Sequence, residues 1–406
     1  MYLRRQNFLY NTVQKVFSNR IFVFLCILPF MLPGFLNEYT IGDVFDWIKV
    51  AVGILMITLV FFQKKLSSGI IAIAFFYFSF VFTSIIKLGN VVSAVKVFSN
   101  AIVFSIIISL GIANNIQVLN DVLTFNMFML WTGELICLFL FPNGICRDNY
   151  YYNAYGFISI DNQLAPFVII SFFILMFNLL NGKKSLISII CLIEMFASVF
   201  ITWSATCIVV AFILLAYIFL FYKKDIESFL DVKVLSLIVL ALFFAIVFFR
   251  VQEIFSFFIE GFLGKSITLT GRTEIWDLAI YQIKQTVLFG RGFCAEHGWI
   301  FWHNKFFYSH NLFLEILLIG GVFSLTFFFI MVFVNFSKIN PNKNRTLSAL
   351  ISICFFATGI CNLTEGYMTS IYFPALFIIA NSFNNLSNYN DMNYFMSSDQ
   401  GEMNYE

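Results

Sequence analysis

Charged residues are scarce in this chain of 406 residues. Asp, Glu, Lys and Arg make up 11% of the sequence, whereas they supply about a quarter of an ordinary soluble domain. Hydrophobic residues make up 60%, so too little polar surface is available for a soluble enzyme. At roughly 20 residues for each helical crossing, the length holds about ten to thirteen spans and leaves no room for a separate soluble catalytic domain.

Sequence motifs for several other functions are also absent. The eight cysteines contain no C-x-x-C pair, so neither a zinc site nor a thioredoxin-like motif is supported. The segment "GRGF" (290–293) has a G-x-G, but it lacks the preceding strand and the remaining glycine of a dinucleotide-binding loop. The formal net charge is only +2 and the basic residues are dispersed, which excludes a stripe that binds nucleic acid.

Long apolar runs dominate what is present, and they predict an all-α polytopic membrane protein. We expect one membrane domain, 1–406, with about 12 transmembrane helices. The run after Arg20 has no small-residue cleavage site, so it is expected to remain as an anchor. The predicted spans are 21–36, 47–62, 69–86, 93–112, 122–141, 164–181, 185–203, 205–222, 233–249, 312–336, 346–361 and 369–383.

The basic residues between the spans predict the orientation. With the N-terminus in the cytoplasm, Lys and Arg collect in the inner loops, whereas the short outer loop 37–46 carries only acidic charges. This pattern follows the positive-inside rule and places both termini in the cytoplasm. The cytoplasmic tail 384–406 is rich in Asn, Ser and Tyr, a composition that predicts disorder.

Two long outer loops have compositions that membrane insertion alone does not explain. The loop 250–311 carries six Lys or Arg against the charge bias, and long loops escape that bias, so the charges need another reason. The loop 142–163 is rich in Tyr and Asn, which suits stacking on sugar rings, but an aromatic belt at the membrane interface explains it equally well. Cys146 and Cys294 lie in these loops, where a disulfide or two unpaired thiols are both compatible with the sequence.

The loop 250–311 contains a predicted amphipathic helix. Thr270 is a suitable N-cap, and apolar residues recur every three to four positions, so we expect one face to lie along the membrane surface. Arg272 falls in the first turn, where a cation is unfavourable unless an anion accompanies it. The apolar positions are Trp276, Ala279, Ile280, Ile283 and Val287.

A phosphate or diphosphate would account for Arg272, because the planar guanidinium binds two oxygens at once and stays charged. Arg291 lies beyond the other end of the helix, between Gly290 and Gly292, whose backbone freedom lets the chain turn toward the same ligand. The alternative is that both arginines contact lipid headgroups.

All three histidines, His297, His303 and His310, fall within fourteen residues of the loop. His310 lies where the chain re-enters the membrane, and imidazole is the side chain best suited to accept a proton near neutral pH. It is therefore the candidate base for a sugar hydroxyl, with a structural capping role as the alternative. A metal site is less favoured, because the histidine spacing is irregular and no acidic cluster accompanies it.

Four glutamates complete the candidates. Glu134, Glu194 and Glu315 lie in predicted spans, where a charge is costly and marks a pathway or an ion pair. One of these three is expected to pair with Arg272 or with Lys96, and neutral carboxyls without a role are the alternative. Glu365, in "NLTEGY" at the outer end of a span, is better placed to orient a base.

At these positions the chain resembles a known family. The succession of Gly271-Arg272, Trp276, Gly290 to Gly292 and Ser309-His310-Asn311, followed by "FLEILLIGG", resembles the C-terminal region of the O-antigen ligase/polymerase family of bacterial membrane glycosyltransferases. A weaker likeness extends to Asn162 in "IDNQLAP" and to Glu365. The remaining spans match only in topology.

The resemblance implies an enzyme of the bacterial inner membrane that needs neither a metal nor another cofactor and acts on the periplasmic or outer face. The implied donor is a glycan on undecaprenyl diphosphate, held by Arg272 and Arg291, with His310 and Glu365 catalytic. The same resemblance implies substrate contacts for four further residues, His303, Asn311, Asn162 and Trp276. One departure stands out: ligases typically carry an arginine in an "S-R"-like motif, where "TWSATC" has Ala205.

We expect a polysaccharide polymerase, for O-antigen or capsule, that transfers the growing glycan to the next lipid-linked repeat unit with inversion. Arginines would neutralise the leaving diphosphate, while His310 takes the acceptor proton. Ligation of O-antigen onto lipid A core is the sister reaction. A transporter of lipid-linked or anionic solutes is the alternative of another class. The expected partners are the lipid-linked donor and acceptor, the bilayer and a chain-length regulator.

Overall fold

The computed structural model describes residues 11–63, 66–147, 153–182, 186–251, 271–294 and 298–389, and within them the chain is helical apart from two short hairpins. Every predicted apolar run contains a helix, which confirms the all-α class. The long helices are α2 (Arg20–Ile27), α3 (Ile41–Gln63), α4 (Ser68–Ile86), α5 (Val91–Asn114), α6 (Ile116–Leu140), α7 (Ala165–Leu180), α8 (Leu186–Thr202), α9 (Ala205–Ala216), α10 (Val232–Val247), α12 (Arg272–Gln285), α13 (Leu312–Phe336), α14 (Arg345–Cys361) and α15 (Tyr372–Asn381).

Short elements join these helices. The hairpins pair β1 (Cys146–Arg147) with β2 (Ala154–Tyr155) and β3 (Ile300–Trp302) with β4 (Lys305–Phe307), both antiparallel. A π-helical turn, η4 (Tyr217–Phe221), extends α9. The 3-10 turns are η1 (Leu28–Phe30), η2 (Gly34–Glu38), η3 (Asp161–Gln163), η5 (Asp225–Phe229) and η7 (Tyr367–Thr369).

Six helical segments in the described chain are long and apolar enough to cross a membrane: α3, α4, α5, α6, α13 and the segment Asp161–Leu180. A pair bent by 76°, Asn11–Phe17 and Arg20–Phe30, adds a seventh if it counts as one span. Five further apolar helices are shorter, at 10–17 residues, below the roughly 20 that a straight crossing needs. The fold is therefore that of an integral membrane protein, and the count of twelve spans stays a prediction.

The two ends of the helical region differ from the sequence prediction. The run 21–36 is not one continuous helix: α2 ends at Ile27 and 3-10 turns follow, because Pro29 and Pro33 cannot donate helical hydrogen bonds. At the other end, residues 383–389 are helical, and Phe383 and Leu386 are buried. The predicted disorder therefore does not hold for 384–389, while 390–406 lie outside the described residues.

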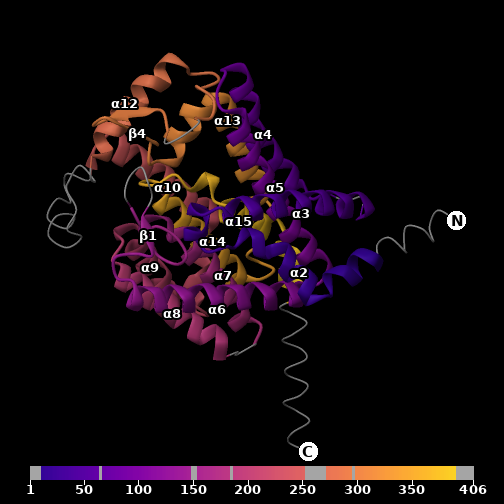
Figure 1. The fold of residues 1–406 in the computed structure, drawn as a ribbon. Coiled ribbons are helices and arrows are strands. Elements are labelled where there is room, and N and C mark those ends of the chain that lie inside the picture. The colour runs from indigo at the N-terminus through magenta and orange to yellow at the C-terminus, as the bar shows by residue number, and fades with distance from the viewer. Residues whose placement is uncertain are drawn as a thin grey trace, which may run out of the picture.

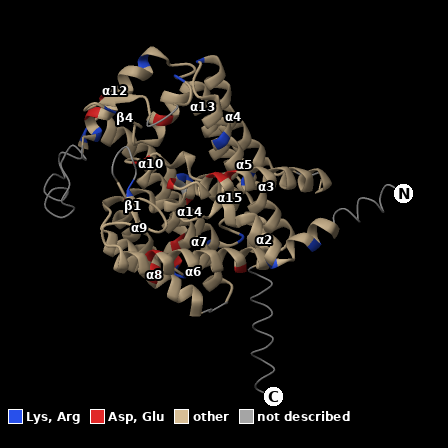
Figure 2. Ribbon diagram, in the orientation of Figure 1, with Lys and Arg blue, Asp and Glu red and all other residues tan. Residues whose placement is uncertain are grey.

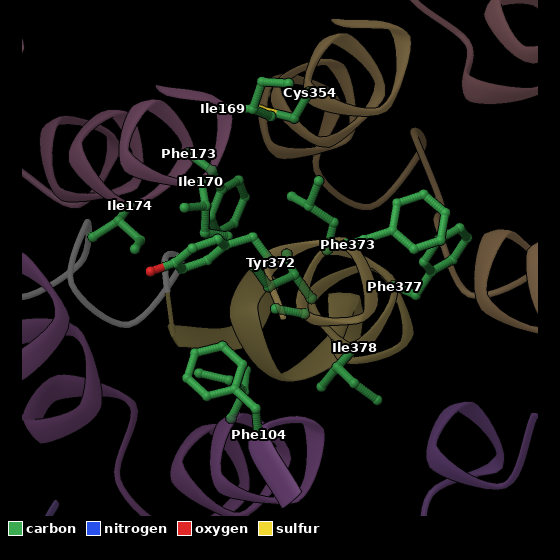
Figure 3. Packing of buried hydrophobic residues seen from close by; sticks show 14 of the residues in the cluster. Phe104, Ile169, Ile170, Phe173, Ile174, Cys354, Tyr372, Phe373, Phe377 and Ile378 are labelled. Carbon is green, nitrogen blue, oxygen red and sulfur yellow. The ribbon is translucent and has the colours of Figure 1, made fainter. Parts of the chain in front are cut away.

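Apolar packing places α15 at the centre of the bundle. Figure 3 shows α15 between Phe104 of α5, Phe173 of α7 and Cys354 of α14, with Tyr372 and Phe377 pointing to opposite sides of the helix. Figure 1 shows α4 and α13 running beside each other. Figure 2 shows how sparse Lys, Arg, Asp and Glu are along the helices, with several gathered around α12.

A smaller apolar cluster supports α12. Its members come from α10, α12, β3, the first turns of α13 and Leu363. The buried face of α12 consists of Ile275, Trp276 and Ala279, whereas Val287 is 47% exposed beyond the helix end. The predicted apolar face therefore packs on protein, where we had expected it to lie along the membrane surface.

The helix α13 is broken at Gly321, where φ is 62° and ψ is −162°. The chain after α12 enters this break: Val322 and Phe323 N–H groups donate to the carbonyls of Val287 and Leu288 at 2.9 and 3.1 Å. Arg291 and Gly292 N–H groups donate to Leu318 and Ile319 at 2.7 and 2.9 Å. The segment 287–292 thus supplies hydrogen bonds that the helix loses, as buried irregular backbone requires. It also fastens the end of α12 to the middle of α13.

Substitution of Gly321 by alanine is expected to lower the unfolding temperature in detergent. A Cβ there would meet the Leu288 carbonyl oxygen at 2.4 Å, and this combination of positive φ and extended ψ, essentially restricted to glycine, costs an alanine about 1–3 kcal/mol. Gly182→Ala is the matched control, since its φ is 68° but nothing lies within 4 Å of the added Cβ. Equal temperature shifts in the two variants would contradict the proposed role of the break.

Candidate functional site

Three of the predicted site residues, Glu365, Arg272 and His310, contact one another through the Glu365 carboxylate. These three residues are called the cluster below. Glu365, between α14 and α15, pairs through Oε1 with Nη2 of Arg272 at the start of α12. Its Oε2 lies 3.0 Å from Nδ1 of His310, just before α13. The side chain of Glu365 is 10% exposed, against 17% for Arg272 and 29% for His310. Glu365 is thus the most buried of the three side chains, and Arg272 and His310 are more exposed.

The electrostatics of the cluster keep Glu365 ionised. Burial of the carboxyl raises its pKa, but the charge of Arg272 and then the hydrogen bond and charge of His310 outweigh burial. The net result is a pKa below the usual value of 4.5. Because an ionised carboxylate only accepts hydrogen bonds, Nδ1 of His310 carries the proton and Nε2 is left as the basic nitrogen.

The backbone around His310 is strained and tightly held. His310 has a φ of 49°, a left-handed conformation that costs a residue other than glycine about 1–3 kcal/mol. The preceding Ser309 N–H donates to the Glu315 carboxylate at 2.7 Å, and the Ser309 carbonyl accepts from Nε1 of Trp276 at 3.0 Å. These bonds fix the imidazole relative to α12, which carries Arg272.

Asn311 and Trp276, for which the resemblance implies substrate contacts, are both fully buried. The Asn311 Oδ1 accepts from the backbone N–H groups of Phe313 and Leu314, so it caps α13, and its Nδ2 donates to the Leu363 carbonyl at 2.9 Å. Trp276 bonds Ser309 instead. The polar groups of both side chains are thus bonded within the protein, and their substrate contacts stay a prediction.

Asn162 lies at the edge of the cluster and is exposed. Its carbonyl accepts from the hydroxyl of Tyr367, two residues after Glu365, and its Oδ1 accepts from Ser204 at 3.2 Å. Ser204 immediately precedes Ala205, the first residue of α9. The position to which the sequence resemblance assigns an arginine in ligases therefore lies at this junction, and here it is the uncharged Ala205.

Arg291 is not brought to the cluster. Its Nη1 donates to Oε1 of Gln282 at 2.7 Å, and its guanidinium lies 4.9 Å from the centre of the Trp299 ring. Gln282 follows Arg272 by ten residues in α12, which corresponds to about 15 Å along a helix axis. The two arginines thus occupy opposite ends of α12, and the structure does not bring them together around one diphosphate.

His303 occupies the exposed turn between β3 and β4, with a φ of 44°. Its ring contacts Trp302 at a centroid distance of 4.2 Å, and Phe307 of the next strand lies 6.4 Å from the His310 ring. Nε1 of Trp302 donates to Glu274 at 2.7 Å, which seats the hairpin on the first turn of α12. His297 lies outside the described residues.

The acids in predicted spans do not pair with Arg272 or Lys96, contrary to expectation. Glu134 accepts the N–H of Ile158 at 2.6 Å, Glu194 accepts from Thr132 at 3.0 Å, and Glu315 holds Ser309. Lys96 instead pairs with Asp46 at 2.6 Å. The three glutamates therefore fasten loops and neighbouring helices.

Two further sequence expectations concern the start of α12 and the cysteines of the outer loops. The N-cap of α12 is Gly271, with a φ of 84° and no side-chain cap, while Thr270 lies outside the described residues. Cys146 and Cys294 form no disulfide with each other in the described chain, and the Cys294 thiol contacts the Gly298 carbonyl at 3.1 Å. Arg272 thus lies at a helix N-terminus whose N-cap, Gly271, supplies no side-chain hydrogen bond, and helix N-termini favour anions.

Sequence reasoning missed Tyr367 and Arg250, both of which contact the site region. Tyr367 is bonded to Asn162, and Arg250 contacts the first turns of α12. Burial raises the pKa of the Tyr367 hydroxyl first of all, and the nearby Glu365 raises it further, so it stays a hydrogen-bond donor. Arg250 belongs to no motif, and Tyr367 closes the segment "NLTEGY" that was quoted for Glu365 alone; the contacts of both residues are evident only in the three-dimensional packing.

No group of three or more His, Cys, Asp or Glu suited to a metal ion occurs within the described ranges. The guanidinium of Arg272 can bind an anion, and the imidazole of His310 beside it can act as a base. In comparisons with known proteins, residues 189–329 match a family model described as O-antigen ligase. The match includes Arg272 and His310 and ends before Glu365. A comparison with curated proteins finds no match.

Proposed function

We propose, on the premise that this chain belongs to the O-antigen ligase/polymerase family, that it is a glycosyltransferase whose reaction takes place at Arg272, His310 and Glu365. The proposed reaction is polymerisation: a growing glycan leaves undecaprenyl diphosphate and joins the next lipid-linked repeat unit. The single observation that supports it most is the carboxylate of Glu365, which contacts an anion-binding guanidinium through one oxygen and an imidazole through the other.

In the proposed mechanism Arg272 binds the diphosphate of the donor through two oxygens. His310 Nε2 takes the proton of the acceptor hydroxyl as that oxygen attacks the anomeric carbon. The new glycosidic bond forms while the bond to the diphosphate breaks, and undecaprenyl diphosphate leaves with the electron pair. Arg272 stabilises the charge that develops on it, and a single displacement inverts the anomeric centre.

Glu365 acts on both partners. It accepts Nδ1–H, so that the imidazole presents Nε2 and the imidazolium formed in the reaction is stabilised. It also neutralises Arg272 while no diphosphate is bound, so the donor must share or displace this ion pair. Binding of the donor and orientation of the base are thus linked through one side chain.

Ligation onto lipid A core uses the same donor chemistry and fits the family match equally well. We favour polymerisation because Ala205 stands where ligases typically have an arginine. Deletion of the gene separates the two reactions. Loss of a polymerase leaves single repeat units on the cell surface, whereas loss of a ligase leaves long chains on undecaprenyl diphosphate.

A transporter would place charged groups around a cavity within the membrane. The hollow of about 630 Å³ between α3, α4 and α5 is lined by apolar residues, and Arg272, His310 and Glu365 do not line it. The deciding experiment is purified protein with a lipid diphosphate-linked oligosaccharide. Longer products without added nucleotide support the proposal, and an unchanged oligosaccharide counts against it.

The pH dependence of stability tests the Glu365 contacts. A lowered pKa contributes stability that is fully present above the usual value of 4.5 and is lost as pH falls through the lower value of the folded chain. At about pH 7 we expect the wild type to unfold at a higher temperature than Glu365→Gln. The difference should shrink only below about pH 4.5. A difference that already disappears between about pH 7 and 5 would contradict this assignment.

A further inference from the structure

A second guanidinium lies against the same turn of α12 as Arg272. Arg250, shortly after α10, donates from Nη2 to the carbonyl of Thr273 at 3.3 Å and pairs with Asp277. Its guanidinium lies 5.8 Å from the centre of the Trp276 ring. Thr273 directly follows Arg272 in the sequence. The two arginines therefore meet one helical turn, which is about 5.4 Å long.

The contacts of Arg250 within the chain leave part of its binding capacity unused. Its Nη1 is buried and has no hydrogen-bond partner among the described residues, although a buried unpaired donor costs free energy. The residue also has a φ of 54°, a strained conformation that clusters at functional sites. Its acidic partner, Asp277, is 69% exposed, and solvent weakens such a pair.

The proposed donor needs more positive charge than Arg272 alone provides. A diphosphate carries at least two negative charges, and Arg272 is already partly neutralised by Glu365. Arg291 lies toward the other end of α12 through Gln282, and Ala205 supplies no charge. Arg250 is the remaining described arginine that contacts the first turns of α12.

We propose that Arg250 is a diphosphate-binding residue that acts together with Arg272, an inference that rests on the proposed function. Nη2 stays on the Thr273 carbonyl and holds the guanidinium plane over Trp276. Nη1 donates to an oxygen of one phosphate while Arg272 binds the other. The Asp277 carboxylate competes with the ligand for the same cation, so it weakens binding in the resting protein.

The test measures binding of farnesyl diphosphate and farnesyl monophosphate to the full chain in detergent. Arg250→Gln is expected to weaken diphosphate binding on the order of tenfold or more, as for loss of a charge-assisted hydrogen bond, and to change monophosphate binding much less. Arg250→Lys should restore part of the loss. Arg291→Gln is the matched control, and its diphosphate affinity should stay within about twofold of wild type.

Asp277→Asn distinguishes a loss of ligand contact in Arg250→Gln from simple misfolding of that variant. Removing the competing carboxylate should tighten diphosphate binding severalfold, whereas a purely structural Arg250–Asp277 pair predicts weaker binding in both variants. Wild-type affinity in Arg250→Gln, or equal losses for monophosphate and diphosphate, would overturn the assignment of Arg250. If Arg272→Gln also binds like wild type, the proposed donor site itself fails.

Discussion

His310→Ala is expected to reduce elongation of a lipid-linked oligosaccharide by about a hundredfold or more, the usual contribution of a positioned general base. The loss follows from Nε2, the nitrogen that does not contact Glu365 and that takes the acceptor proton in the proposed mechanism. The measurement is the initial rate of elongation by purified protein at matched membrane insertion. The pH profile should change as well, because the wild-type rate depends on a neutral imidazole and the variant rate does not.

The control for this variant is His303→Ala. His303 is exposed at the tip of a hairpin and lacks the contact with Glu365, so its loss should lower the rate far less. A wild-type elongation rate in His310→Ala, or equal losses in the two histidine variants, would remove His310 from the mechanism.

Arg272→Ala should also lower elongation by on the order of a hundredfold or more, as expected when a group that stabilises developing charge is lost. Arg272→Lys should recover only part of the rate, because an ammonium group cannot bind two oxygens in the fork geometry. Arg291→Ala serves as the comparison, since its guanidinium contacts Gln282 and Trp299. Similar losses in the two arginine variants would contradict the separation of their roles.

The double variant Arg272→Ala with Glu365→Gln, compared with the two single variants, measures how strongly these side chains interact in the folded protein. Removal of Arg272 alone leaves an uncompensated, largely buried carboxylate beside His310. Removal of both charges relieves that cost, so the effects on stability should not add. Strictly additive changes in unfolding temperature would mean that the two side chains do not interact in the folded protein.

The parts of this molecule that follow local rules could be predicted from the sequence. Apolar runs gave the helices, and an arginine in a first helical turn identified Arg272 as an unusual cation. The clustering of histidines pointed to the segment that carries His310. Glu365 was identified because it lies at the outer end of an apolar run, and the structure places it between the other two.

The remaining features depend on packing between distant segments. Trp276 falls on a periodic apolar face, and the sequence alone does not tell whether that face meets lipid or protein. The Gly320-Gly321 pair in "FLEILLIGG" is compatible with an intact helix, and the break becomes evident only with residues 287–292 bonded inside it. Arg250 and Tyr367 could not be identified from the sequence, because the residues that they contact come from other elements.

The break in α13 also bears on how the site responds to its surroundings. Arg272 is coupled to the first half of α13 through Trp276 and Ser309, and Asn311 ties the 362–365 segment to that same half-helix. A bilayer of different thickness that displaces this half-helix would carry the Arg272 guanidinium, the His310 imidazole and the Glu365 carboxylate together. Their mutual spacing would survive, and only the depth at which they meet the proposed lipid-linked donor would change.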